Sequence, residues 1–307
     1  MAHAHHHHEH HAHGHAPQRY DRAFAIGIAL NLGFVLVEAF YGWQVNSLAL
    51  LADAGHNLSD VGGLLLAWAA LAATRLRPDD RHTYGWRRGS ILASFINAVI
   101  LLVAMGSLGW ESIQRLQQPV VMVGETVMVV AGIGVLVNAV TAALFLSGSR
   151  SDLNLRGAFL HMAADALVSV GVVLAGALYL WQGWSWIDPL VSLAIAVVIV
   201  LGTWSLFRQS LHLLFDGVPE QVDLPALRAY LLGLPGVCDV HDLHVWAMST
   251  AEVALTAHMA MSPLPEDDRF LQSIARELHE QFGIDHATLQ LERDLGCPLG
   301  CARPSAG

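Results

Sequence analysis

Residues 48–74 read LALLADAGHNLSDVGGLLLAWAALAAT, a largely apolar stretch that carries three ionisable side chains. A helix of about 20 apolar residues spans the hydrocarbon core of a bilayer, and this stretch is long enough to do so. An ionisable group inside hydrocarbon is costly and usually has a functional reason. Asp53, His56 and Asp60 therefore predict a polar site within a membrane-spanning helix.

Five further segments of similar length and composition lie along the chain, separated by short connections. Hydrophobic residues make up 54% of the sequence and charged residues only 14%, where soluble proteins carry about 25% charged residues. The chain is therefore expected to be a six-helix membrane protein. Besides 48–74, the predicted spans are Ala23–Trp43, Ser90–Ile113, Val120–Leu146, Leu155–Trp181 and Ile187–Leu214.

The positions of the positive charges predict the orientation of these helices. The chain has no lysine, and nine arginines fall on one side of the membrane, whereas Arg115 stands alone on the other. Positive charge gathers in cytoplasmic loops. Both termini and the second and fourth connections are therefore expected in the cytoplasm, with the helices in the plasma (inner) membrane. The nine are Arg19, Arg22, Arg75, Arg77, Arg81, Arg87, Arg88, Arg150 and Arg156.

The composition changes after the last predicted span. Residues 216–307 hold fourteen acidic residues and five arginines, and helix-like and strand-like patterns alternate there. This predicts a small cytosolic α+β domain, whose modest core would benefit from dimerisation. The expected helices and strands, in chain order, are Leu224–Leu232, Gly236–Met248, Glu252–Met261, Asp267–Phe282 and Ala287–Glu292.

Charge and cysteine content exclude other classes of protein. The formal net charge is −10, and no basic block offers a surface for nucleic acid. Three cysteines are too few for a disulfide framework. We therefore expect four parts: a His-rich cytosolic tail (1–19), a six-helix membrane domain (20–214), a cytosolic α+β domain (215–295) and a Cys-containing C-terminus (296–307).

The polar residues of the spans repeat one motif. His56 and Asp60 have the spacing His-x-x-x-Asp, and so do His161 and Asp165. Residues four apart lie on one face of a helix, so two such faces would present two imidazoles and two carboxylates to one point. That donor set suits tetrahedral Zn2+, whereas Ca2+ and Mg2+ prefer oxygen ligands.

Two other interpretations of this motif stay open on spacing alone. The side chains could be structural polar groups that hydrogen-bond between helices. A bundle-embedded oxidase centre is the second alternative, but a di-iron site uses Glu-x-x-His spacing, and no predicted span contains it.

Other polar or small residues of the spans are assigned supporting roles. Asp53, one turn from His56, is interpreted as part of a release-side vestibule rather than as a ligand. Gly62 and Gly63 are expected to allow close helix packing. Four residues could line a water-filled path or bond between helices: Asn31, Glu38, Asn97 and Asn138.

The six-helix hydropathy, the run from Ser47 to Asp60 (SLALLADAGHNLSD), the partner motif at His161 and Asp165, and the α+β tail resemble the cation diffusion facilitator family. The resemblance is greatest to its zinc-exporting branch and extends from Tyr20 to Glu292. It implies that His56, Asp60, His161 and Asp165 form the transport site. In that family, histidine at the position of His56 goes with a preference for zinc over cadmium.

The same resemblance implies a homodimer whose cytosolic domains have a metal-chaperone-like fold and bind further zinc. The matching ligand positions there are His241, His258, Glu292 and Asp294. A charge pair near the dimer seam matches Arg88, or its neighbour Arg87, with Asp216. Some members also bind metal between the second and third helices. Here Asp79 and His82 remain, but Trp86 replaces another histidine, so this loop site is expected to be absent or weak.

Histidines and cysteines elsewhere give weaker signals. Nine of the 18 histidines lie between His3 and His15. They form a metal-gathering tail, an inert tail or an affinity tag, and the first is favoured because neutral imidazole binds zinc. Cys297 and Cys301 could bind zinc or remain free thiols. Cys238 is expected to be a buried small apolar residue, and His244 is a weaker candidate ligand near His241.

These features predict a secondary transporter rather than an enzyme. Zinc binds neutral imidazole and deprotonated carboxylate, so zinc and protons compete for the same side chains. The hypothesis is export of Zn2+ from the cytoplasm in exchange for H+, with zinc also a regulatory ligand of the cytosolic domain. Its rivals are another divalent transition metal as cargo, and a membrane-tethered zinc sensor or buffer that does not transport. The expected partners are the bilayer, divalent metal ions, protons and a second copy of the chain, without nucleic acid.

Overall fold

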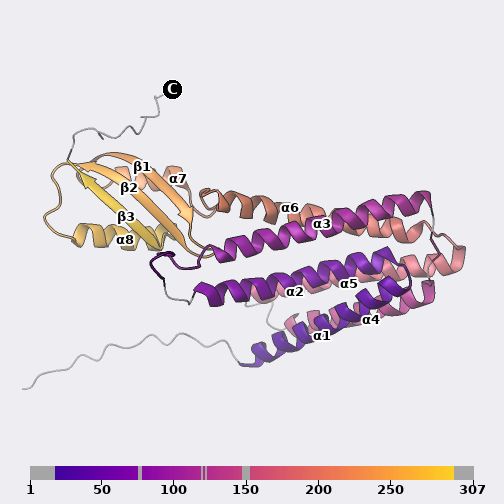
Figure 1. The fold of residues 1–307 in the computed structure, drawn as a ribbon. Coiled ribbons are helices and arrows are strands. Elements are labelled where there is room, and N and C mark those ends of the chain that lie inside the picture. Colours follow the sequence, from indigo (N-terminus) through magenta and orange to yellow (C-terminus); the bar gives the residue numbers. More distant parts are fainter. Residues whose placement is uncertain (1–17, 75–77, 119, 122, 147–152, 294–307) are drawn as a thin grey trace, which may run out of the picture. The chain divides into compact units, whose positions relative to one another are not determined.

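Six long helices and a small α+β domain make up the computed structural model, which describes residues 18–74, 78–118, 120–121, 123–146 and 153–293 (Figure 1). Each predicted span coincides with one helix, and the bounds differ by a few residues at most. The helices are α1 (Gln18–Gln44), α2 (Leu48–Thr74), α3 (Gly89–Gln117), α4 (Gly124–Leu146), α5 (Leu153–Gln182) and α6 (Ile187–Leu214).

Length and hydropathy identify four of these helices as membrane spans, and the other two are long enough to be spans. Over the described residues, α3, α4, α5 and α6 each contain a segment long and apolar enough to cross a bilayer. The helices α1 and α2 are both 27 residues long, which is sufficient at about 1.5 Å per residue. The predicted multi-pass membrane architecture is therefore confirmed.

The chain divides into two compact units, one within residues 1–61 and 107–197 and the other within residues 62–106 and 198–307. In the first unit α4 packs along α5, and α1 contacts α4. Small residues allow this close approach between membrane helices. A Cβ on Gly134 would lie 2.7 Å from the Phe34 ring and 3.2 Å from Ser169 Oγ, and one on Gly176 would lie 3.3 Å from the Gly124 carbonyl oxygen.

A buried aspartate fixes the start of α2 in the same unit. Asp188, in the first turn of α6, accepts a hydrogen bond from Ser47 Oγ at 2.5 Å and another from the Leu48 backbone N–H at 2.9 Å. The first N–H groups of a helix have no partner within the helix, and a carboxylate there is also favoured by the helix dipole. Asp188 therefore ties the N-terminus of α2 to α6.

Within the second unit, the cytosolic domain follows the order helix, two strands, helix, strand. Strand β1 pairs antiparallel with β2, and β2 pairs parallel with β3, so the sheet order is β1-β2-β3 (Figure 1). The parallel pair needs a crossover, and α8 provides it. The elements are α7 (Leu224–Leu232), β1 (Val237–Ala247), β2 (Val253–Met261), α8 (Arg269–Phe282) and β3 (His286–Glu292).

One face of this sheet and both helices enclose the hydrophobic core. Alternate residues of β2 and β3 point into it, as the period of two in a strand requires. The core comprises Leu227 and Leu231 from α7, Val240 and Val245 from β1, Val253, Leu255, Ala257 and Met259 from β2, and Ile274 and Leu278 from α8, with Leu289 and Leu291 of β3 packed against them. The other sheet face is free for polar residues.

Irregular positions in β1 set the direction of its side chains. The pairing with β2 shifts between His241 and His244, where Asp242 has a φ of 50°. An inserted residue of this kind is a β-bulge, and it lets Val240 and Val245 share the core face although they are an odd number of residues apart.

The expectation for Cys238 was wrong. A second pairing shift, between Val237 and Asp239, coincides with Cys238, and its side chain is exposed. The irregular pairing takes this residue out of the strand alternation that would have buried it.

The cytosolic core generates a stability prediction. Leu278→Ala empties a fully buried position, and we expect it to destabilise this domain by about 2–5 kcal/mol. The temperature at which trypsin cuts the domain in the purified full-length protein should fall. The matched control is Leu232→Ala, at an exposed position of α7, which should leave that temperature nearly unchanged. Equal effects of the two substitutions would contradict the described core.

Candidate metal sites

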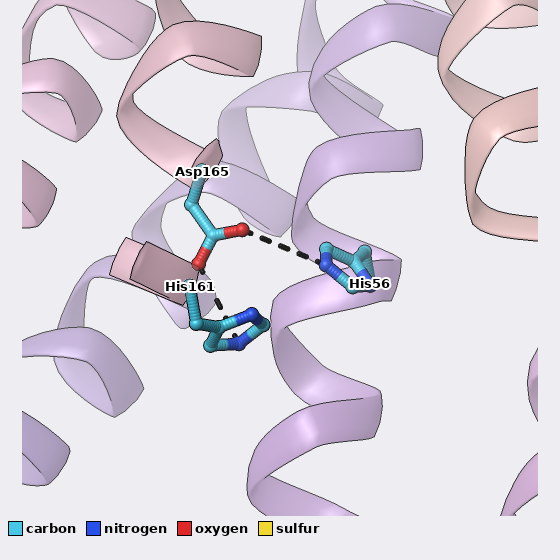
Figure 2. A group of neighbouring side chains, drawn as sticks. All are labelled: His56, His161 and Asp165. Atoms are coloured by element: carbon cyan, nitrogen blue, oxygen red, sulfur yellow. Dashed lines mark ion pairs between the residues drawn. The ribbon is translucent and has the colours of Figure 1, made fainter. Parts of the chain in front are cut away.

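The two His-x-x-x-Asp motifs face each other between α2 and α5. Asp165 lies between the imidazoles of His56 and His161, as Figure 2 shows. His56 Nε2 is 3.6 Å from Asp165 Oδ1, and His161 Nε2 is 3.7 Å from Asp165 Oδ2. Ligand atoms of these three residues all lie within 4.8 Å of one another, so one metal ion could contact all three.

Asp60 completes the group from the other end of the α2 motif. Its Oδ2 lies 3.0 Å from His161 Nε2 and 3.5 Å from His56 Nε2. Each carboxylate therefore contacts both imidazoles, and the four predicted residues come together. We refer to His56, Asp60, His161 and Asp165 as the membrane cluster.

The chemistry of the membrane cluster suits a borderline-soft divalent ion. Two imidazole nitrogens and two carboxylates match the ligand types that bind Zn2+ in tetrahedral sites. The His56 Nδ1 and Asp165 Oδ2 atoms are buried and lack hydrogen-bond partners in the described part of the chain. Buried polar atoms are usually satisfied, so this polarity favours a ligand-binding role over a purely structural one.

Beyond the membrane cluster, the same two helices carry a further polar layer. Ser169 Oγ donates to Asp53 Oδ2 at 3.0 Å, and Asn57 Nδ2 lies 3.3 Å from Asp53 Oδ1. Asp53 is 1% exposed, so in this structure it does not line an open vestibule as interpreted from the sequence. It also adjoins the fully buried carboxyl of Glu38 on α1.

A second cluster lies on the polar face of the cytosolic sheet, and each strand contributes one residue to it. His241 of β1 pairs directly with His258 of β2. Glu292 of β3 reaches both imidazoles, with Oε2 3.3 Å from His241 Nε2 and Oε1 3.1 Å from His258 Nδ1. Their ligand atoms lie within 4.8 Å of one another. We call these three residues the sheet cluster.

Two imidazole nitrogens that face Glu292 without a hydrogen bond are consistent with metal binding at the sheet cluster. His241 Nε2 and His258 Nδ1 are buried and make no hydrogen bond within the described residues. The bulge residue Asp242 adds a neighbouring carboxylate, with Oδ2 3.5 Å from His258 Nε2 and Oδ1 2.8 Å from His244 Nε2. His244 is thus held by Asp242, outside the three mutually close ligands.

In the described part of the loop between α2 and α3, Asp79 is the centre of a group of local hydrogen bonds. The backbone N–H groups of His82 and Arg81 donate to Asp79 Oδ1 at 2.6 and 2.8 Å, and these bonds lower the pKa of that carboxyl. The His82 ring stacks on Trp86 with centroids 4.4 Å apart. Among the residues described, no group of three ligands forms in this loop.

The predicted charge pair forms within one chain. Arg88 Nη2 contacts Asp216 Oδ1, while the neighbouring Arg87 contacts Glu252 Oε2 at 3.1 Å instead. Both arginines lie in the turn just before α3, and their partners belong to the segment after α6 and to the turn before β2. The sequence left Arg87 as an alternative partner of Asp216, and the structure separates the two roles.

The three asparagines of the spans differ in their surroundings. Asn31 Nδ2 lies 3.1 Å from Met162 Sδ, and the amide atoms of the buried Asn138 lack partners among the described residues. A Cβ on Gly63 would lie 2.9 Å from Asn97 Nδ2, which fits the expected packing role. Several predicted residues lie outside the described part of the chain: Asp294, Cys297, Cys301 and the histidines between His3 and His15.

Sequence reasoning missed Ser169, Asp188 and Asp242. Ser169 follows Asp165 by four residues, and this helical spacing could have placed it on the ligand face. Asp188 at the start of an apolar helix had the usual signal of a cap for its own helix α6, but not for α2, whose first N–H group it binds. Asp242 had none, because its position depends on a bulge that a single sequence does not reveal.

Comparisons with known proteins agree with this division of the chain. Residues 24–215 match the family described as the cation efflux transmembrane domain, and residues 219–294 match the cation efflux protein cytoplasmic domain. Together the two matches cover nearly all described residues.

Full-length relatives are similar over most of their own length. The chain is 37% identical to "Zinc transporter ZitB" of Escherichia coli, covering 88% of this chain and 86% of that protein. It is 34% identical to "Cadmium, cobalt and zinc/H(+)-K(+) antiporter" of Bacillus subtilis, covering 89% of each. It is 35% identical to "Metal cation efflux system protein CzcD" of Cupriavidus metallidurans, covering 90% of this chain and 88% of that protein.

A solved structure, "Metal-bound C-terminal domain of the CzcD transporter from Cuprividus metallidurans", is 33% identical to the chain. It covers 23% of this chain and 99% of that chain, with a TM-score of 0.22.

The geometry of the membrane cluster predicts the effect of removing one ligand. Asp165→Asn keeps the size of the side chain but removes its charge, and we expect it to lower zinc bound by the purified full chain by about one ion per chain. Equilibrium dialysis against buffered zinc measures this. Asp80→Asn, the same change at an exposed loop position, is the control and should bind as much zinc as the unsubstituted protein. Unchanged binding by Asp165→Asn would place the site elsewhere.

Proposed function

Because this chain belongs to the cation efflux family of membrane transporters, we propose that it exports Zn2+ from the cytoplasm in exchange for protons. The membrane cluster is the proposed transport site. Relatives named as a zinc transporter and as a cadmium, cobalt and zinc antiporter support zinc as cargo and antiport as mechanism. The cycle needs no covalent step.

The contact between His161 and Asp60 is the observation that carries the proposal. A nitrogen and a carboxylate oxygen approach to 3.0 Å when a proton lies between them. Zinc binding at the same nitrogen requires that proton to leave, because the metal needs the lone pair. Zinc and a proton are thus alternative occupants of one position, which is the minimal requirement for exchange.

Access to the membrane cluster is graded along the two helices. The side chain of His161 is 43% exposed and that of Asp60 is 34% exposed, whereas that of Asp165 is 4% exposed. The more open end is the one that the arginine asymmetry assigns to the cytoplasm, with both termini on that side and the helices in the inner membrane. Zinc would therefore enter past Asp60 and His161 and leave past the closed end.

The cytosolic parts of the chain supply the proposed regulation. We place a regulatory zinc ion at the sheet cluster, with Asp294 as a further ligand, and a second copy of the chain across the cytosolic domain and the Arg88–Asp216 pair. The small core of this domain supports dimerisation, and the two imidazole nitrogens that face Glu292 without a hydrogen bond support the ion. The His-rich tail would raise the local zinc concentration, and Cys297 and Cys301 are candidate additional ligands.

A flux measurement tests the central proposal. Purified protein is reconstituted in liposomes that contain a zinc-sensitive dye, and zinc is added with and without an opposing pH gradient. We expect zinc movement that the gradient accelerates. A membrane-tethered sensor or buffer would bind zinc but produce no flux, and that result would overturn the proposal.

Asp60→Ala gives the residue-level test in the same liposomes. Removing a carboxylate that contacts both imidazoles should lower flux by about 100-fold or more, as the loss of a metal ligand does. Asp80→Ala, in the exposed loop after α2, should retain normal flux. Normal flux by a folded Asp60→Ala protein would exclude the membrane cluster as the transport site.

Deletion of residues 2–15 tests the role assigned to the His-rich tail. The deletion should weaken the apparent zinc affinity by at most about tenfold without abolishing maximal flux, because the tail gathers ions but contributes no membrane ligand. Dependence of the flux rate on zinc concentration measures both quantities. Complete loss of flux would contradict the accessory role.

A further inference from the structure

Two buried carboxyl groups beside the membrane cluster have no arginine partner among the described residues. Glu38 of α1 is 0% exposed and Asp53 of α2 is 1% exposed, and the two groups adjoin each other. The chain has no lysine, and no arginine is among the groups that act on either carboxyl in the described residues. Two neighbouring carboxylates in a desolvated site do not both stay ionised, so the pair holds a proton.

Hydrogen bonds assign that proton to Glu38. Asp53 faces two donors, the Ser169 hydroxyl at 3.0 Å and the Asn57 amide at 3.3 Å, and such donors stabilise a carboxylate. The two carboxyl oxygens of Glu38 are buried and accept no hydrogen bond within the described residues. Glu38 therefore carries the proton as a neutral acid, and its O–H can point toward the ionised Asp53.

The pair stands close to the membrane cluster without belonging to it. Asp53 precedes His56 by three residues on α2, and Ser169 follows Asp165 by four residues on α5. The pair is therefore about one helical turn, or about 5 Å along the axes, from those ligands. The charged or titratable groups that act on it are His56 of α2 and Asp165 of α5, besides the two carboxyls themselves.

This spacing couples the pair to the cargo by charge alone. A divalent cation about one turn away favours the doubly ionised pair, and a proton on the pair reduces the negative charge that attracts the cation. Metal and proton therefore oppose each other without competing for an atom. The pair also lies on the closed side of the membrane cluster, opposite to the end at which zinc enters.

We propose that Glu38 and Asp53 form a shared proton-binding site of the exchange cycle, separate from the metal ligands. The pair releases its proton when zinc occupies the membrane cluster and takes up a proton, from the side toward which zinc leaves, when zinc departs. The inference rests on the proposed exchange of zinc for protons and assigns part of the proton transfer to residues that never touch the metal.

Proton release on zinc binding tests the pair directly. Zinc is added to the purified full chain in weakly buffered detergent solution with a pH-sensitive dye, and the protons released per zinc are counted. Glu38→Gln should release about one proton fewer per chain at unchanged zinc stoichiometry. Glu125→Gln, the same change at an exposed position in the first turn of α4, is the matched control and should release the normal number.

Asp53→Asn provides a second, independent variant. Because the proton is shared, Asp53→Asn should lose the same proton, and the double variant should lose no more than either single variant. Additive losses would show two independent acids and overturn the shared site. Unchanged release in both single variants would show that the pair keeps its proton throughout, as a purely structural pair would.

Flux in liposomes separates this inference from the proposed function. In Glu38→Gln, we expect zinc exchange without a pH gradient to continue, while the acceleration by a gradient falls about tenfold. If the unsubstituted protein shows no zinc flux, the proposed function itself fails. If it shows gradient-driven flux that Glu38→Gln and Asp53→Asn retain in full, only the proton site is overturned.

Discussion

The high free energy of an isolated charge in an apolar environment is the constraint on which the membrane unit depends. Each buried acid described there is matched by a group that offsets this cost. Asp188 accepts from the start of α2, Asp53 accepts from Ser169 and Asn57, and Asp165 lies between two imidazoles. Glu38 is the exception, because its two carboxyl oxygens have no hydrogen-bond partner among the described residues, and a proton is the simplest way to neutralise it. The polar residues of the unit thus compensate one another's charge, and in the proposed cycle a bound cation or bound protons would complete that compensation.

The two candidate metal sites reach similar donor sets from different secondary structure. In the membrane unit the spacing of four residues along a helix supplies one imidazole and one carboxylate per helix. In the cytosolic domain one side chain comes from each of three strands, and the polar sheet face holds them together because the opposite face is occupied by the core. The bulge at Asp242 preserves this arrangement, because without the extra residue either Val245 would leave the core face or His241 would leave the polar face.

Much of the fold followed from hydropathy, because 20-residue apolar helices have few alternatives in a bilayer. The spans and the α+β elements were predicted within a few residues, and the membrane cluster was predicted from a repeated local motif. Features that depend on the exact backbone pairing of distant segments were not predicted. The capping of α2 by Asp188 and the exposure of Cys238 depend on chain pairing that no local pattern encodes. The sequence also showed Glu38 as a polar residue of a span, but it did not show that Glu38 lies beside Asp53.

The tie between Asp188 and the start of α2 restricts how the membrane cluster can move. A helix held at one end swings about that end, and displacement grows with distance from it. His56 and Asp60 lie eight and twelve residues beyond Leu48, so a tilt of about 10° would carry them roughly 2 Å and 3 Å respectively. Such a swing is enough to break the 3.0 Å contact between Asp60 and His161 while Asp53, nearer the pivot, shifts by only about 1 Å. With Asp188 as the pivot, a small rotation of α2 would move Asp60 furthest and separate it first from His161. The polar layer at Asp53 would stay nearly stationary.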